Sequence, residues 1–344
     1  MKYSAHKLIN DLLSELNERQ REVLTGRFGL GKSGRMETLA ALGARYRVTR
    51  ERVRQIEASA LLLLKKHIAQ NSGWQEILER GKKELKEVGG VLETGELLKI
   101  LREYVEDLNQ NQLALILESS RSFFFYPEDK EHWHFYALDK NSYKNATALV
   151  EKWISLLRSR KEHVLAGKYE NLWNEFVAKR EMKPHHAHNH VSISKKIHRN
   201  PYGDVGLTEW SEILPRTIRE RVYLILRKKK EPMHFRNITK AINEIFKNRS
   251  QASAPTVHNE LIKDERFVLV GRGIYALREH GYEPGTAKEV IARILKQQGS
   301  LRPKDVILAV QKERFFKPNT VLVNLQNRNY FIRKKDGTYV VREA

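Results

Sequence analysis

Four side chains near residue 50 have the types and spacing of a base-reading helix face: Arg50, Glu51, Arg54 and Gln55. They stand at i, i+1, i+4 and i+5, so a helix would present them on one side. In the major groove arginine pairs with guanine, glutamine with adenine and glutamate with cytosine. The alternative is an amphipathic helix whose charges are merely solvated, although neither capping nor amphipathicity requires this run of residues.

A helix-turn-helix would position this face. A first helix beginning at Leu39 and a second one capped by Thr49 place small Gly43 where the two helices pass closely. Apolar residues follow both helices at the spacing of a buried stripe: Leu42, Tyr46, Val48, Val53, Ile56, Ala60 and Leu63 or Leu64. Arg47 and Arg52 would flank the reading face and reach phosphates.

This part of the chain closely resembles region 4 of bacterial sigma-70 factors. The matching segments are LNERQREVL at 16–24, RFGL at 27–30, VTRERVRQIE at 48–57 and AL at 60–61. The resemblance implies that Arg50, Glu51, Arg54 and Gln55 read the minus-35 promoter hexamer, with Thr49 and Arg52 beside them. It also implies docking on the flap of the RNA polymerase β subunit.

The composition favours a nucleic-acid partner. The 63 Lys and Arg outnumber the 42 Asp and Glu, for a net charge of +21 and a sequence pI of about 9.9. The chain has no cysteine, which excludes disulfides and thiolate zinc fingers. The longest aliphatic run, residues 60–64, is too short to cross a bilayer, and no signal-peptide core is visible. We therefore expect a cytoplasmic, nucleoid-associated bacterial protein with no membrane partner.

An internal repeat organises the second half of the 344 residues. Thr256, Val257, Leu261, Phe267 and Tyr275 recur 64 positions later as Thr320, Val321, Leu325, Phe331 and Tyr339. Helices are expected at 217–229 and 234–246 in the first copy and at 287–297 and 303–313 in the second, each pair followed by a third helix and a two-stranded wing. This order predicts winged helices.

A third, degenerate copy is expected at residues 74–140. Leu113, Leu117 and Phe123 stand 144 positions before Val257, Leu261 and Phe267. Its aromatic wing, around residues 123–136, is interpreted as a packed hairpin, with a base-stacking platform as the alternative. Residues 143–182 show a helical stripe, and residues 184–204 are interpreted as irregular or a short hairpin.

The predicted fold is mainly α, a helix-turn-helix head followed by serial winged helices with small β-wings. Its predicted domains are a sigma-70 region 4-like head at 1–72, a winged helix at 74–140, a helical connector at 141–213, and two winged helices at 214–284 and 285–344.

Residues 214–282 resemble the HARE-type helix-turn-helix domain, which is found in the RNA polymerase delta subunit and attached to DNA-modifying and chromatin proteins. PMHFRNI at 232–238, TVHNEL at 256–261 and GRGIYALREHGY at 271–282 carry the likeness. The resemblance implies a role in transcription or DNA engagement. Arg272 at the wing tip is a predicted phosphate contact, as are nearby Arg216, Arg219 and Arg221; a solvated charged face is the alternative for each.

Two chemical motifs are discounted. Residues 26–33 (GRFGLGKS) match the P-loop pattern, but a P-loop needs a preceding β-strand, and the apolar spacing before residue 28 is helical. The histidine-rich run 185–190 (HHAHNH) could bind a transition metal. The setting looks like a loop without Cys or carboxylate ligands, so a solvated basic loop is expected instead.

The sequence therefore predicts a sequence-specific, sigma-like DNA-binding regulator whose partners are promoter DNA and RNA polymerase. No nucleophile with a paired base is visible, so no enzyme, cofactor, metal or small-molecule substrate is expected. Nothing in residues 70–344 resembles sigma region 2, which favours an accessory factor that does not open promoters alone. The alternatives are a delta-like polymerase interaction protein and the recognition subunit of a DNA-modifying system.

Overall fold

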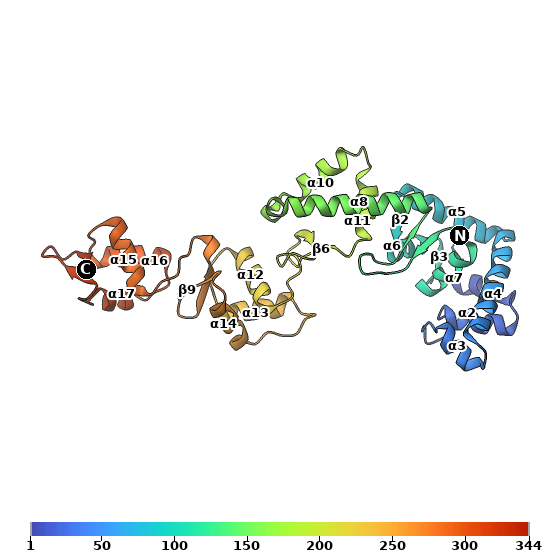
Figure 1. Ribbon diagram of the computed structural model, residues 1–344, viewed down its shortest axis with the longest axis horizontal. Coiled ribbons are helices and arrows are strands. Elements are labelled where there is room, and N and C mark those ends of the chain that lie inside the picture. Colours follow the sequence, from blue (N-terminus) through green and yellow to red (C-terminus); the bar gives the residue numbers. More distant parts are fainter. Residues whose placement is uncertain (1, 343–344) are drawn as a thin grey trace. The chain divides into compact units, whose positions relative to one another are not determined.

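The computed structural model describes residues 2–342 and divides the chain into two compact units. One unit contains Met1–His198 with Val205–Thr208, and the other contains Arg199–Asp204 with Glu209–Ala344. The described residues are mainly helical, and their strands form only small two- and three-stranded sheets (Figure 1). The predicted mainly α class is confirmed at this level.

The first unit begins with a short strand and four helices: β1 (Tyr3–Ser4), α1 (Ala5–Ser14), α2 (Glu18–Arg27), α3 (Leu39–Tyr46) and α4 (Arg50–Gln70). Asn17 and Gln20 form a reciprocal capping box at the start of α2. Thr38 and Thr49 cap α3 and α4 through their side-chain oxygens. The predicted starts of both helices of the helix-turn-helix are thus confirmed.

A second group of elements packs against the end of α4. It comprises α5 (Ser72–Glu87), β2 (Val91–Glu93), α6 (Thr94–Leu101), β3 (Val105–Glu106), α7 (Gln110–Ser120), β4 (Phe124–Tyr126) and β5 (Phe135–Ala137). Strands β2, β5 and β4 form an antiparallel sheet in that order, and β1 pairs in parallel with β3. One hydrophobic core runs from Ala5 through Leu64 and Trp74 to Tyr136, so the head and these elements share it.

The remaining elements around this unit are mostly helical: α8 (Lys140–Ser159), α9 (Lys161–His163), the π-helical turn η1 (Val164–Lys168), α10 (Tyr169–Ala178), α11 (Pro184–Ser192), β6 (Ile197–Arg199) and β7 (Val205–Leu207). The expectation of irregular structure was wrong for residues 184–192, which form α11. Proline at the first position of α11 suits a helix start. His186 and His190 of α11 bond to the carbonyls of Glu87 and Gly89 at the end of α5, so segments far apart in the sequence are in contact. The short hairpin expected as the alternative is present as the paired strands β6 and β7.

The second unit repeats one order of elements twice. The first copy is α12 (Ile218–Lys229), β8 (Met233–His234), α13 (Phe235–Ile245), α14 (Ala254–Lys263), β9 (Phe267–Gly271) and β10 (Ile274–Leu277), followed by the 3-10 turn η2 (Arg278–His280). The second copy is α15 (Ala287–Gln298), α16 (Pro303–Glu313), α17 (Pro318–Leu325), β11 (Phe331–Arg333) and β12 (Tyr339–Val341). The first two helices of each copy begin and end within one residue of their expected limits.

The sheets of the copies are built alike. In the first copy of the second unit the strand order is β8-β10-β9, so the last strand of the hairpin, β10, lies in the centre. The β2-β5-β4 sheet of the first unit likewise has its last strand, β5, in the centre. In the final copy the outer strand is reduced to a single bridge between Leu301 and Tyr339. Each copy of the second unit has its own hydrophobic core, centred on residues such as Ile225 and Leu261 in one and Ile294 and Phe331 in the other.

Candidate nucleic-acid interface

The turn between α3 and α4 is fixed by close packing. Val23, Leu42 and Val53 are fully buried between α2, α3 and α4. A Cβ on Gly43 would lie 2.8 Å from the carbonyl oxygen of Val48, so only glycine fits where α3 meets the start of α4. Farther along α4, Leu64 rather than Leu63 continues the buried stripe. This packing leaves the opposite side of the first turns of α4 in solvent.

The structure brings the predicted reading residues together on that solvent side. Seven side chains at or next to the start of α4 are exposed: Arg47, Thr49, Arg50, Glu51, Arg52, Arg54 and Gln55. They extend over the first turn and a half of a helix, a length that fits the major groove of duplex DNA.

Within this face, Glu51 and Arg54 already bind each other. Arg54 donates from Nε to Glu51 Oε2 over 2.9 Å and from an Nη to Oε1 over 2.6 Å. This hydrogen bonding holds the pKa of Glu51 below its usual range and raises that of Arg54. Arg52 similarly donates to Gln55 Oε1 over 3.2 Å. The sequence argument missed both pairs, although their i,i+3 spacing on one helix is the signal that predicts them.

The arginines of the head fall into two classes. Arg27 is paired with Glu57 at 2.8 Å, Arg45 is paired with Glu37 at 2.6 Å, and Arg19 lies 3.8 Å from the Tyr46 ring centroid. Arg47 and Arg50, in contrast, make no ion pair among the described residues. Arg47 ends α3 in the left-handed conformation, with φ 55°, which projects it beside α4. Two cations without an ion pair among the described residues, Arg47 and Arg50, therefore lie at the reading face.

The basic residues predicted in the second unit have different environments. Arg272 is exposed in the turn between β9 and β10, as expected for a wing tip. Arg219 binds Glu260 over 2.7 Å and also approaches Asp264. Arg221 is 4% exposed, against the Phe246 ring. Burial excludes Arg221 as a phosphate contact, so that prediction was wrong: the residue lies on the inward side of α12.

The aromatic hairpin of β4 and β5 is partly packed and partly open. Phe135 and Tyr136 are buried, and Tyr126 stacks on Tyr143 with ring centroids 4.2 Å apart. Phe124 and Phe125 are 42% and 51% exposed. The packed-hairpin interpretation therefore holds for β5, while β4 presents two rings to solvent.

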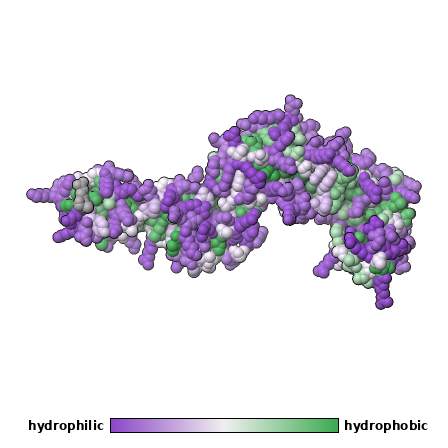
Figure 2. All heavy atoms as spheres, in the orientation of Figure 1, coloured by the Kyte–Doolittle hydropathy of each residue, from purple (hydrophilic) through white to green (hydrophobic). Residues whose placement is uncertain are grey.

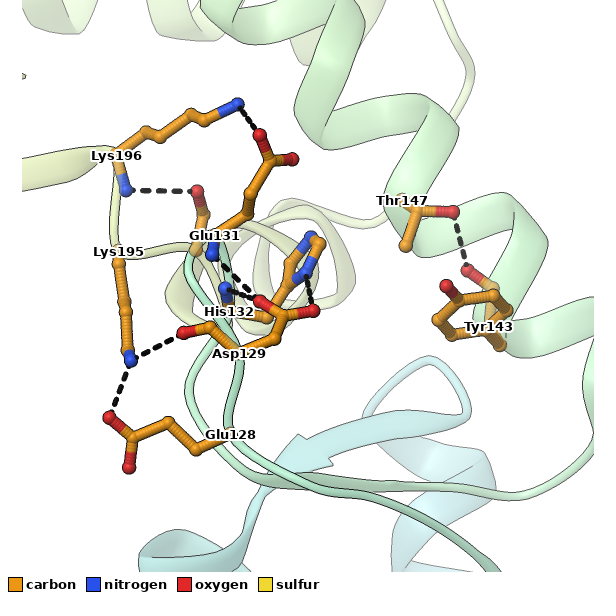
Figure 3. Close-up of polar contacts among 9 residues, drawn as sticks. Glu128, Asp129, Glu131, His132, Tyr143, Thr147, Lys195 and Lys196 are labelled. Carbon is orange, nitrogen blue, oxygen red and sulfur yellow. Dashed lines mark hydrogen bonds and ion pairs between the residues drawn. The ribbon is translucent and has the colours of Figure 1, made fainter.

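Lys195 and Lys196 bind the loop between β4 and β5 through hydrogen bonds and ion pairs. Lys195 bonds to Glu128 and to the carbonyl of Asp129, and Lys196 bonds to Glu131 over 2.5 Å (Figure 3). Asp129 in turn accepts from the backbone N–H of His132 over 2.6 Å. The acidic side chains of the loop are thus neutralised within the unit and do not form a free negative patch.

The structure places the two discounted motifs in helical settings. The P-loop pattern at 26–33 follows helix α2, not a strand, so its amides are not aimed as a phosphate cradle requires. In the histidine-rich run, His186 Nε2 donates to the Glu87 carbonyl and His190 Nε2 to the Gly89 carbonyl, each over 2.8 Å. Among residues 2–342 no group of three or more His, Cys, Asp or Glu could hold a metal ion. No helix in the same range is both long and apolar enough to cross a membrane.

Comparison with known proteins identifies the head. Residues 12–66 match the family model for Sigma-70, region 4. The chain is 50% identical over 64 residues to the RNA polymerase sigma factor SigA1 of Synechococcus elongatus, a match covering 19% of this chain and 16% of that protein. It is 46% identical over 70 residues to SigA of a Nostoc species, covering 20% and 17%, and 46% identical over 57 residues to SigA of Lactococcus lactis subsp. cremoris, covering 17% and 15%.

The chain thus spans about a sixth of the length of these curated relatives. The matched residues are α2, α3, most of α4 and the end of α1, which include the whole exposed face around Arg50 and Arg54. Residues 12–66 are therefore a sigma-70 region 4-like DNA-binding module, as in RNA polymerase sigma factors, and the rest of the chain is unassigned.

Proposed function

We propose that this protein is a sequence-specific, sigma-like transcription regulator that reads promoter DNA in the major groove through the start of α4 and contacts RNA polymerase, at the β flap, through the head. The observation that carries the proposal is the exposed face of Arg47, Arg50, Glu51, Arg54 and Gln55 on a module matching sigma-70 region 4. The partners imply action in the bacterial cytoplasm and no catalysis by the chain itself.

Base readers and phosphate contacts have separate roles on this face. Arg54 and Gln55 lie one turn into α4, where side chains reach base edges. Arg47 and Arg52 are exposed beside these residues, which suits phosphate contacts, and Arg50 remains with the base readers. Glu51 accepts two hydrogen bonds from Arg54, so these donors are occupied in the free protein and must be released before Arg54 can pair with a base edge.

The repeated helix-strand-helix-helix-hairpin units extend the proposal beyond the head. We assign them as winged helices, because each places its third helix before a two-stranded hairpin, and in the two three-stranded sheets the last strand of that hairpin lies in the centre. In the unit of residues 218–277 the likeness to HARE-type domains supports a role in transcription, with Arg272 as a phosphate contact at the wing tip.

Binding measurements on a site selected from random duplexes test the reading face. Replacing Gln55 by alanine is expected to cost about 1–3 kcal/mol on the selected site and little on random duplex. Arg54→Ala needs a companion, since it leaves the Glu51 carboxylate unpaired beside the DNA; the double variant Glu51→Ala/Arg54→Ala separates base loss from repulsion. Lys66→Ala, exposed farther along α4, is the matched control. Equal losses on selected and random duplexes would contradict specific reading.

Transcription assays test the regulatory part. With core polymerase and this protein alone, thymines of a native promoter should stay unreactive to permanganate. With a complete sigma factor added, the protein should change transcript levels, and the change should disappear in the Arg50→Ala/Arg54→Ala variant. Reactive thymines without the sigma factor would show that the protein opens DNA by itself.

A polymerase interaction protein is the second candidate, and the hairpin of β4 and β5 favours it. Phe124 and Phe125 are exposed on one short strand at the edge of a sheet, and Trp133 nearby is 45% exposed. Exposed aromatic rings are typical of protein contact surfaces. Loss of polymerase co-purification in Phe124→Ser/Phe125→Ser, with promoter binding unchanged, would support this role.

A further inference from the structure

The two copies in the second unit differ in charge at equivalent positions of the third helix. In the first copy, Glu260 and Asp264 at the end of α14 bind Arg219, and Asp264 also binds Arg266. Sixty-four positions later, the corresponding residues of the last copy are Asn324 and Arg328. The acidic side chains that neutralise cations beside α14 are therefore replaced by an amide and a cation beside α17.

The hairpins differ even more. Residues 269–271 of β9 are Leu-Val-Gly, and the equivalent residues 333–335 are Arg-Lys-Lys. The apolar hairpin is covered by the neighbouring copy: Phe315 donates its N–H to the Val270 carbonyl over 2.7 Å, and buried Arg314 donates to the Leu269 carbonyl over 3.3 Å. A Cβ on Gly271 would lie 2.8 Å from the Phe315 Cβ, so glycine permits this approach. The backbone of strand β9 in the first hairpin is therefore already bonded to Arg314 and Phe315 of the next copy.

The last hairpin is free and cationic. Arg333, Lys334 and Lys335 are exposed and have no ion pair among residues 2–342. The one acidic residue of the turn, Asp336, is directed into the turn, where its carboxylate accepts from the N–H and hydroxyl of Thr338 over 3.0 and 2.7 Å. These bonds hold the pKa of Asp336 below its usual range. The end of β11 and the turn therefore carry three consecutive cationic residues.

Helix α17, which precedes this hairpin, exposes a polar face. Val321 and Leu325 are buried against α15 and α16, while side chains of α17 and of the two residues that follow it are exposed at i, i+1, i+4, i+7 and i+8: Asn319, Thr320, Val323, Gln326 and Asn327. Amide and hydroxyl groups can donate to and accept from base edges, and an apolar group such as valine contacts the thymine methyl. Figure 2 shows that hydrophilic residues dominate the visible surface of the chain.

We propose that the last copy, residues 287–341, is a second duplex-DNA-binding module, in which α17 contacts the major groove and Arg333, Lys334 and Lys335 contact backbone phosphates. The combination of an exposed amide-bearing helix and an unpaired cationic hairpin fits a groove flanked by phosphates. The inference extends the proposed function and does not depend on DNA binding by the head.

The test uses the full chain carrying Arg50→Ala/Arg54→Ala, so that binding by the head is suppressed. Into this background we place Arg333→Gln/Lys334→Gln/Lys335→Gln, or the control Lys229→Gln/Lys240→Gln/Lys247→Gln, which removes equal charge from exposed sites of the other copy. Affinity for a mixed-sequence DNA duplex is measured at several salt concentrations. Loss of three phosphate contacts should reduce the slope of log K against log salt by about 2.7 and weaken binding, and the control should retain the parent slope.

Three results would overturn the proposal. An unchanged slope in the hairpin variant would show that these cations do not contact DNA. An equal decrease of the slope in the control variant would show that only the net charge of the chain matters. Tighter binding of a single-stranded RNA of equal length, lost in the same variant, would assign the site to RNA. If the hairpin variant does not fold, Asn319→Ala/Gln326→Ala on the exposed face of α17 replaces it; full retention of guanine methylation interference would then contradict major-groove contact.

The outcome is independent of the head. In an otherwise unaltered chain, the hairpin variant should keep the footprint of α4 on its selected site and lose only an added protected segment. If the unaltered chain shows no preference for a selected site but its binding still depends on salt through Arg333, Lys334 and Lys335, the proposed function is contradicted and the inference about the last copy stands.

Discussion

The unit at residues 72–137 and the one at 287–341 each place three helices before a closing hairpin, but they have different sources of stability. In the first, α5, α6 and α7 share a hydrophobic core with the head, including Leu64 and Ile68 of α4. In the second, the buried side chains of α15, α16, α17 and β11 form a core of their own. A repeat in sequence therefore does not define a unit of unfolding, which follows the continuity of buried apolar contacts.

The largest expected effect tests the shared core. Trp74 is fully buried at the start of α5, so Trp74→Ala should lower the free energy of unfolding by about 3–5 kcal/mol. Because the core is continuous, hydrogen exchange should increase in α4 as well as in α5 and α7. Trp133→Ala, at a residue 45% exposed, is the control. Increased exchange restricted to α5–α7 would show that the head folds separately.

The next effect tests the independent core of the last copy. Ile294 is buried in α15, and Ile294→Ala should lower the unfolding free energy of residues 287–341 by about 2–5 kcal/mol. Hydrogen exchange should increase in α15–α17 and remain unchanged in α2–α7. Leu308→Ala, exposed on α16, should change little. Increased exchange throughout the chain would disprove the contrast between the two units.

A smaller effect is expected at the cap of α4. Thr49 accepts from the Arg52 N–H over 3.1 Å, and Thr49→Ala should cost about 0.5–2 kcal/mol. If the head is coupled to α5–α7, chemical denaturation should show the loss in the transition of the whole first unit. Thr49→Asn, which can cap equally well, should restore stability. A loss that only frays the first turn of α4 would argue against coupling.

The smallest expected effect is a pH dependence peculiar to the first unit. Burial lowers the pKa of His190 below the usual 6.5 of a histidine, and its Nε2 donates to the carbonyl of Gly89. The unfolded chain therefore takes up this proton at a higher pH than the folded chain, so stability should fall as pH decreases below about 6.5. His190→Gln should flatten the dependence in thermal melts, and His188→Gln is the control. A pH dependence that persists in His190→Gln would assign it to other groups.

Local signals made much of this structure predictable. Thr49 as a cap, Gly43 at the helix crossing and the helices of the second unit follow from periodicity and capping chemistry, which act within a few residues. Helix α11 did not follow, because its position depends on imidazole bonds to α5, about a hundred residues earlier.

The candidate sites divide in the same way. The exposed reading face of α4 follows from spacing on one helix, whereas the burial of Arg221 and the cover of Phe315 over β9 are contacts between separate segments. Arg-Lys-Lys at 333–335 is visible in the sequence. Its candidacy as a DNA contact depends on the structure, in which the equivalent strand β9 is bonded to Arg314 while residues 333–335 are exposed.

If the head reads promoter DNA as proposed, the ion pair of Glu51 and Arg54 affects how it searches along the duplex. A guanine edge can replace the carboxylate as the bidentate partner of Arg54, whereas a site without guanine at that position offers no substitute. On such sites the pair stays closed and nearly neutral, which reduces adhesion to random sequence and favours sliding. The head can then dwell where guanine opens the pair, so the same carboxylate that weakens every encounter improves discrimination among them.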